Sequence, residues 1–172
     1  MSNIERLQDA ALKLLLETSD KKASERQLQR RVLFILRVKF GPLSRDPQLP
    51  IVFQEEHIFI GKSSHPKRVD YIKKGTNPIP IELAVRPSDG NSELYGYRNR
   101  DELNKLTRYT PSKARLRALL LVDMKDQPID RARLKQSYDT ILSGPGNYER
   151  TSVRVIYSAP MPFVEFPNTN PV

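Results

Sequence analysis

The residues of this sequence best suited to chemistry are two acids that stand among apolar neighbours. Asp70 lies in the run RVDYI, and Glu82 lies in the run IPIELAV. Successive side chains of a strand point to opposite faces, so Glu82 and Ala84 share the face opposite to the aliphatic residues of their run. An equivalent position of Asp70 on a paired strand would bring the two carboxylates together. Adjacent carboxylates repel unless a cation or a proton lies between them, so this pattern predicts a divalent metal site.

Phosphodiester hydrolysis is the reaction that such a site would serve, because bound metal ions can supply the nucleophilic water and stabilise the charge at phosphorus. We expect Mg²⁺ (or Mn²⁺) to be held by Asp70 and Glu82, with Glu25 as the third candidate ligand. Glu25 lies three residues before Leu28, on the predicted helix face that packs against the sheet. Its position directly after Ser24 is equally explained by the favourable interaction of a carboxylate with a helix N-terminus.

The elements that must position these acids predict an α/β fold, with a mixed central sheet flanked by helices. Apolar residues at helical spacing predict an N-terminal helix from residue 4 to between 18 and 22. They predict a second helix that begins with a capping box at Ser24 and Gln27. Three strands then follow at residues 51–61, 69–72 and 79–85. After them come a helix at 92–109, which can break near Gly96, a strand at 116–124, a helix at 129–142 and a strand at 153–157.

Length and composition favour one domain. The 172 residues suffice for one core, so we expect a single domain over residues 1–158 and a proline-rich, extended or disordered tail over residues 159–172. The absence of Cys excludes disulfides, thiolate catalysis and Cys-ligated zinc, and it fits a reducing compartment. No apolar run approaches the roughly 20 residues of a membrane span. We therefore expect a cytoplasmic protein without a membrane partner.

The charge balance indicates a polyanionic partner. Lys and Arg total 29 against 20 Asp and Glu, which gives a formal charge of +9. A basic surface attracts nucleic acid, although a solvated surface without a partner would have the same composition. The cations near the acids predict a nucleic-acid interface, with DNA as the expected partner. These cations are Lys67, Arg68, Lys73, Lys74, Arg86, Arg98 and Arg108.

The order of elements and the acids on them resemble the PD-(D/E)XK nuclease superfamily, the restriction-endonuclease-like fold, over residues 24–157. The resemblance implies a core of helix, three-strand meander, helix and strand. It places Asp70 at the start of the second core strand and Glu82 as the acid of the (D/E)-x-K signature. Glu25 matches the Glu that the family often carries on its first core helix. Lys105–Tyr109 matches the family's Gln-Leu-x-x-Tyr pattern, with Lys in place of Gln.

One position departs from the family pattern. Ala84 stands where the family usually has the lysine that orients or polarises the attacking water. We expect Lys105 to replace it from the following helix, as relocated lysines do in some divergent nucleases. Arg86 shares the strand parity of Glu82, but a guanidinium stays protonated and would stabilise phosphate charge without acting as a base. Both cations are equally explained as surface residues of a basic protein.

The sequence therefore predicts a metal-dependent nuclease, a hydrolase that cuts nucleic acid at Asp70, Glu82 and Lys105. A first alternative is a catalytically degenerate nuclease fold that binds nucleic acid or a protein partner without cutting. A second is a structural or assembly subunit whose basic surface meets an acidic protein partner. A homodimer is compatible with the nuclease prediction, because small nucleases commonly use two copies to cut two strands.

Overall fold

The computed structural model of this chain describes residues 1–18, 23, 25–40, 53–59, 67–90, 92–109, 114–143, 152–160 and 164–166. Within these ranges, the side chains of residues 25, 53–59, 67–68, 108–109 and 164–166 lie outside what is described. None of the helices in the described ranges combines the length and the apolar composition that crossing a lipid bilayer requires.

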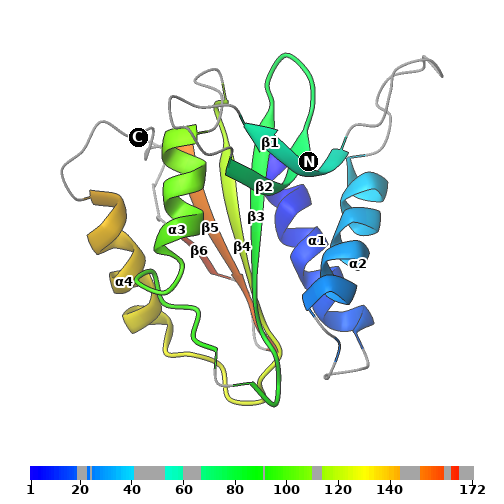
Figure 1. Cartoon of the computed structure of the whole chain (residues 1–172). Helices are drawn as coiled ribbons and strands as arrows, with labels where there is room; N and C mark the ends of the chain where they lie inside the picture. The colour runs from blue at the N-terminus through cyan, green and yellow to red at the C-terminus, as the bar shows by residue number, and fades with distance from the viewer. Residues whose placement is uncertain are drawn as a thin grey trace.

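The described elements alternate between helices and strands and confirm the predicted α/β class, a mixed sheet flanked by helices (Figure 1). The helical elements are α1 (Asn3–Glu17), α2 (Glu25–Lys39), α3 (Arg100–Asn104), the π-helical turn η1 (Lys105–Tyr109) and α4 (Arg131–Ser143). The strands are β1 (Phe53–Phe59), β2 (Lys67–Lys73), β3 (Ile79–Arg86), β4 (Arg117–Asp123), β5 (Val153–Ser158) and β6 (Val164–Phe166).

The sheet follows the chain order, β1-β2-β3-β4-β5-β6. The first three strands form an antiparallel meander, and β3, β4 and β5 run parallel to one another. Parallel neighbours require a crossover, which α3 with η1 supplies between β3 and β4, and α4 supplies between β4 and β5.

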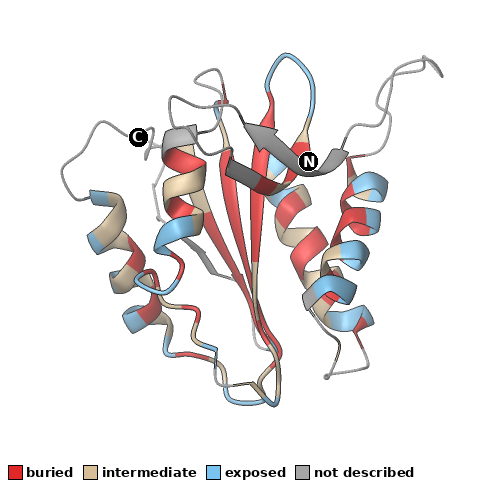
Figure 2. Ribbon diagram, viewed as in Figure 1, coloured by how far each residue is buried: buried red, intermediate tan, exposed pale blue. Residues whose placement is uncertain are grey.

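The helices cover the two faces of the sheet as separate layers. Helices α1 and α2 pack on one face, while α3, η1 and α4 pack on the other (Figure 1). In β4, Leu120 and Val122 face the α1–α2 layer, whereas Leu119 and Leu121 face the α3–α4 layer. A strand buried on both faces needs no polar alternation, which explains the continuous apolar run predicted here. Figure 2 shows the central strands buried along most of their length.

Strand β3 has the alternation that its sequence predicts. Ile81 and Leu83 belong to the α1–α2 layer, and Ala84 packs against the α3–α4 layer. Glu82 has the parity of Ala84 and is almost completely buried, with 1% of its surface exposed. A buried carboxyl therefore lies beneath the α3–η1 segment, the part of the chain that can supply a partner to it.

The helix predicted over residues 92–109 begins later than expected. The chain turns through Tyr95–Asn99 and becomes helical only at Arg100. Gly96 lies against α4, where an added Cβ would stand 2.7 Å from the carbonyl oxygen of Ser137. This close approach of two backbones, a tertiary contact, replaces the first turns of the predicted helix.

Strand β6 near the C-terminus and the capping box of α1 were not predicted. Part of the tail is ordered as strand β6, which pairs antiparallel with β5, so the sheet extends past residue 158. The capping box predicted at Ser24 lies outside the described residues. Helix α1 has a capping box that the prediction missed, in which the Ser2 hydroxyl accepts from the Glu5 N–H at 3.2 Å and the Ser2 N–H donates to the Glu5 carboxylate at 2.6 Å.

Candidate functional site

The pairing of β2 with β3 ends one residue before the two predicted acids would face each other. The register runs from Lys73↔Ile79 to Tyr71↔Ile81, and one further step would set Asp70 opposite Glu82. At this step the Asp70 carboxylate, through Oδ2, accepts the backbone N–H of Leu83 at 2.8 Å. The Asp70 carboxylate thus accepts a hydrogen bond that a backbone carbonyl of β2 would otherwise accept, and the backbone of β3 fixes its orientation.

Asp70 and Glu82 interact directly. Burial, then the negative charge of Asp70, and a hydrogen bond with it raise the pKa of Glu82 to about 9, against the opposing effect of Lys105. A carboxyl with this pKa retains its proton near neutral pH. The protein alone therefore holds its two acids together with a proton on Glu82 and with the Lys105 ammonium beside them.

Lys105 reaches Glu82 from the α3–η1 segment. Its Nζ atom lies 2.9 Å from Glu82 Oε1, and its side chain is 22% exposed. Burial is the largest influence on the pKa of Lys105 and lowers it, but attraction to Glu82, a hydrogen bond with it, and attraction to Asp70 and Glu102 together raise the pKa above its ordinary value. Lys105 is therefore a charged ammonium group held beside both acids.

The local structure of η1 holds Lys105 in this place. Leu103 and Leu106 are buried in the α3–α4 layer on either side of it, and the Thr107 hydroxyl donates to the Leu103 carbonyl at 2.8 Å. The π-helical turn η1 contacts both β2 and β3. A π-helical turn inserted into a helix shifts the side chains that follow it, and such turns recur at functional sites.

The two acids fit a divalent cation. In the part of the chain that the structure describes, no three His, Asp or Glu side chains gather into one group, so Asp70 and Glu82 would be the carboxylate ligands. The Oε1 atom of Glu82 is buried and, apart from its ion pair with Lys105, makes no hydrogen bond of suitable geometry. Mg²⁺ is bound by one or two carboxylates together with water and substrate oxygens, which this pair can satisfy.

Models of known protein families, curated proteins and solved structures give no match to this chain. The interpretation of the site therefore depends on its geometry and on the order of its elements.

Glu25 is the first residue of α2, and its side chain is not among the described ones. The beginning of α2 lies against β2, because the Tyr71 hydroxyl donates to the carbonyl of Gln29 at 2.8 Å. Gln29 is one helical turn after Glu25, and Tyr71 is adjacent to Asp70. The start of α2 therefore lies beside β2, but on the α1–α2 face that Tyr71 shares, opposite to the face of Glu82, and the role of Glu25 as a ligand stays a prediction.

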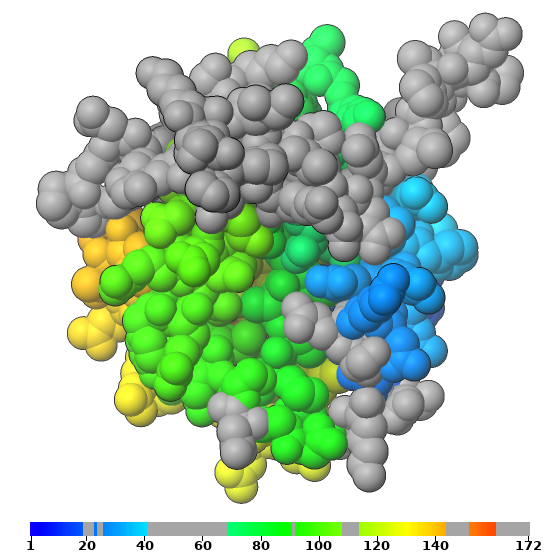
Figure 3. Space-filling view, in the orientation of Figure 1, coloured from blue at the N-terminus to red at the C-terminus, as the bar shows by residue number. Residues whose placement is uncertain are grey.

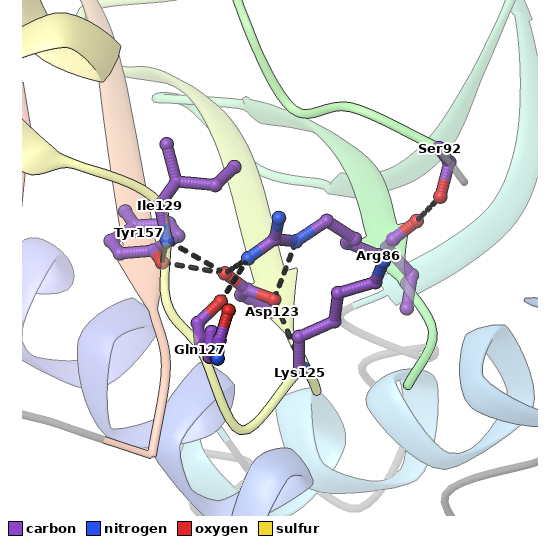
Figure 4. A network of polar contacts seen from close by, with 8 residues as sticks. Arg86, Ser92, Asp123, Lys125, Gln127, Ile129 and Tyr157 are labelled. Atoms are coloured by element: carbon purple, nitrogen blue, oxygen red, sulfur yellow. Dashed lines mark hydrogen bonds and ion pairs between the residues drawn. The ribbon is translucent and has the colours of Figure 1, made fainter. Parts of the chain in front are cut away.

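Arg86 has a different role from the predicted one. Its Nε donates to Asp123 Oδ1 at 2.8 Å, and its Nη2 donates to Asp123 Oδ2 at 2.6 Å and to the Gln127 carbonyl at 2.8 Å (Figure 4). Only 7% of the Arg86 surface is exposed. Burial favours a lower pKa for Arg86, but the hydrogen bond and the charge of Asp123 outweigh it, so the pKa is raised. We therefore correct the prediction and remove Arg86 from the nucleic-acid interface.

Asp123 completes a polar cluster that the sequence analysis missed. Besides Arg86, its carboxylate accepts from the Tyr157 hydroxyl at 2.6 Å and from the backbone N–H groups of Lys125 and Ile129 at 3.1 and 3.4 Å (Figure 4). The Tyr157 hydroxyl also accepts from the Ile129 N–H at 3.1 Å. We name Arg86, Asp123 and Tyr157 the arginine–aspartate cluster. Position 86 faces position 123 in the parallel register, a signal visible only once that register is known.

The remaining predicted cations are spread over two regions. Lys73 is partly buried and Lys74 is exposed, both beside the β2–β3 turn, and Arg98 is exposed before α3. Lys74 follows Asp70 by four residues, which on a strand is about 13 Å. Lys67 and Arg68 lie on β2 and Arg108 lies on η1, but their side chains are outside the described residues, so their predicted roles are untested.

Proposed function

We propose that this protein is a metal-dependent nuclease that hydrolyses phosphodiester bonds of nucleic acid, with DNA as the expected substrate. The observation that carries the proposal is the approach of Asp70 to Glu82 where the β2–β3 pairing ends, with Lys105 beside Glu82. The order α2, β1-β2-β3, α3–η1 and β4 supports a restriction-endonuclease-like core, because it matches the helix, meander, helix and strand of that core.

Each group has a defined role in this proposal. Asp70 and Glu82 bind Mg²⁺ (or Mn²⁺), and Glu25 assists directly or through water. When bound, the cation would lower the pKa of a water molecule and neutralise charge on the phosphate. Asp70 keeps its orientation through the Leu83 N–H, so its second oxygen can face the cation. Glu82 must first release its proton, because only the carboxylate is a ligand.

Lys105 supplies the amine that the family's signature lysine, at the position of Ala84 in this chain, would provide. The methyl group of Ala84 packs against the α3–α4 apolar layer and has no proton to donate. The Lys105 ammonium, 2.9 Å from Glu82, is close enough to hydrogen-bond a water molecule or a phosphate oxygen bound beside that carboxylate. Its three donors allow it to remain on Glu82 while it orients the nucleophile.

The direct test is cleavage of supercoiled plasmid and of circular single-stranded DNA with Mg²⁺, with Mn²⁺ and with EDTA. We expect cleavage only with a divalent ion, and a loss of about 100-fold or more in Asp70→Asn, Glu82→Gln and Lys105→Met. Lys135→Met is the matched control, because Lys135 also pairs with an acid, Asp139, but on the outside of α4. Undiminished cleavage by Asp70→Asn would overturn the proposal.

A second candidate is a nuclease fold that binds nucleic acid, or a protein partner, without catalysis. Two observations favour it: Ala84 lacks the signature amine, and Lys105 already pairs with an acid that the cation requires. Binding of oligonucleotides that weakens steeply with salt, together with no cleavage under any divalent ion, would select this candidate. A stable protein partner with no affinity for nucleic acid would select the assembly-subunit alternative.

A further inference from the structure

Two arginines and two tyrosines stack in a row on the surface where the turn before α3 meets α4. The Arg133 guanidinium carbon lies 5.0 Å from the ring centroid of Tyr95. The rings of Tyr95 and Tyr97 are 5.8 Å apart and inclined by 10°, and the Arg98 guanidinium carbon lies 5.5 Å from the Tyr97 centroid. We name Arg133, Tyr95, Tyr97 and Arg98 the arginine–tyrosine ladder.

The backbone beneath the ladder is anchored to α4. Gly96, between the two tyrosines, donates its N–H to the Ser137 hydroxyl at 3.0 Å and leaves no room for a side chain against the Ser137 carbonyl. Directly after the ladder, the Asn99 amide donates to the Tyr138 hydroxyl at 2.8 Å. Backbone contacts around the two tyrosines therefore hold this turn against α4, and the Tyr95 ring also packs against the α3–α4 layer.

The ladder is accessible. Tyr97 is 52% exposed, and both arginines are exposed. In Figure 3 the green atoms of the α3 segment form part of the surface toward the viewer, next to the orange and yellow atoms of α4. A half-exposed tyrosine contributes little to the core, and the Tyr97 ring stacks on the Tyr95 ring and on the Arg98 guanidinium. Exposed aromatic faces beside guanidinium groups are the usual means of stacking unpaired bases and binding the phosphates between them.

We propose that the arginine–tyrosine ladder binds single-stranded nucleic acid. In a duplex both faces of each base are covered by neighbouring pairs, so only an unpaired base can stack on Tyr97. The exposed side chain of Arg98 can leave the ring for a phosphate when a base takes its place. This inference rests on the proposed function and extends it, because it assigns the substrate a single-stranded segment.

The ladder is close to the candidate active site along the chain. Lys105 follows Arg98 by seven residues, and the segment is helical from Arg100, so the two positions are separated by about 10 Å. A strand that stacks on Tyr97 can therefore extend to the candidate active site within a few nucleotides.

The test measures binding of the full chain to fluorescein-labelled dT12, U12 and a 12-base-pair DNA duplex by fluorescence anisotropy in EDTA. We expect Tyr97→Ala to weaken binding of the single strands about 5- to 100-fold, Tyr97→Phe to change it by less than about 2-fold, and neither to change duplex binding. Arg98→Ala should also weaken binding of the single strands, and Arg6→Ala is its control, because Arg6 stacks on Phe40 at 5.7 Å away from the ladder. Equal affinity of Tyr97→Ala and wild type for both single strands would overturn the inference, as would an equal loss on the duplex.

A second measurement avoids dependence on a variant that folds. A dT12 strand with one 5-iodouracil is photocrosslinked to the wild-type protein, and the modified peptide is identified by mass spectrometry. We expect the crosslink within the Tyr95–Arg98 segment, and crosslinks confined to other segments would contradict the ladder. Since both measurements are made in EDTA, Tyr97-dependent binding without cleavage under divalent ions would refute the nuclease proposal alone. Cleavage with Tyr97-independent binding would refute the ladder alone.

Discussion

Two buried acids on the same face of the sheet have opposite surroundings. Asp123 accepts two hydrogen bonds from Arg86, one from Tyr157 and further ones from backbone N–H groups. Glu82 has the Lys105 ammonium as the one close partner of its Oε1 atom, an acidic neighbour in Asp70 and a pKa raised to about 9. A buried polar network that is fully satisfied holds elements together, whereas an acid with fewer partners is the better candidate for a ligand site.

The cations that pair with these two acids, Arg86 and Lys105, are also held differently. Arg86 is bound in a fork geometry to one carboxylate, which joins the end of β3 to the loop after β4. Lys105 makes a single contact at the end of a flexible side chain that is 22% exposed. A point charge of this kind can exchange partners when a substrate enters, while the arginine fork cannot without losing several hydrogen bonds.

The largest expected effect is the loss of stability when the arginine–aspartate cluster is broken. Asp123→Ala leaves the Arg86 guanidinium and the Tyr157 hydroxyl buried without their acceptor, so we expect the free energy of unfolding to fall by about 3–5 kcal/mol. Urea denaturation measures this change. Asp9→Ala, which breaks the partly exposed Lys39–Asp9 pair, is the control and should cost less than about 1 kcal/mol. Equal losses in the two variants would remove the distinction between the clusters.

The acid pair should make stability depend on pH. Since the pKa of Glu82 is about 9 in the folded protein and about 4.5 when unfolded, the folded state binds the extra proton between these values. The stabilisation is complete below pH 4.5 and is lost as pH rises through 9, so we expect the free energy of unfolding to be about 3 kcal/mol lower at pH 8 than at pH 6. Glu82→Gln should abolish this difference, as followed by urea denaturation at each pH. A slope retained in Glu82→Gln would assign it to other groups.

The position of the amine can be tested by moving it. In Lys105→Met we expect cleavage to be almost lost, and a second change, Ala84→Lys, should restore it by about 10-fold because the amine then approaches the acids from β3. Rates of plasmid cleavage measure the recovery. Ala84→Lys in the wild-type background shows whether the new side chain disturbs the packing of Ala84 against the α3–α4 layer. No recovery with a folded double variant would argue against a shared role for the two positions.

The smallest effect concerns binding of the cation itself. At a concentration about five times its dissociation constant, Mg²⁺ should raise the free energy of unfolding by about 1 kcal/mol in wild type. The same addition should leave Asp70→Asn and Glu82→Gln unchanged, because each lacks a carboxylate ligand. Binding should also release a proton below pH 9, since Glu82 must ionise. Isothermal titration calorimetry in two buffers measures that release, and its absence would count against Glu82 as a ligand.

Much of the architecture was predictable from local patterns. Alternation in IPIELAV predicted that Glu82 would lie opposite the aliphatic residues, and the structure places it there. The helix predicted at 92–109 began later because Gly96 packs on Ser137 of α4, a contact between residues far apart in the sequence. Strand β6 was also missed, since a three-residue strand has too little pattern to be distinguished from an extended tail.

In the candidate site too, local patterns predicted some residues and tertiary contacts decided the others. Asp70 and Glu82 were predicted from their apolar neighbours, and Lys105 from its place in the helix after the third strand of the meander. Arg86 has the same strand parity as Glu82, so parity alone assigned it to the same site. Its true partner, Asp123, faces it through the parallel β3–β4 register.

The sequence by itself determined the α/β class, the faces of the strands and the acids that stand among apolar residues, because these follow from side-chain periodicity along a single element. Only the tertiary structure decided which acid pairs with which cation. Lys105 meets Glu82, and Arg86 meets Asp123, because strand register and the docking of η1 set distances between residues that are far apart in the chain. Such distances depend on the packing of several elements together, so no local pattern contains them.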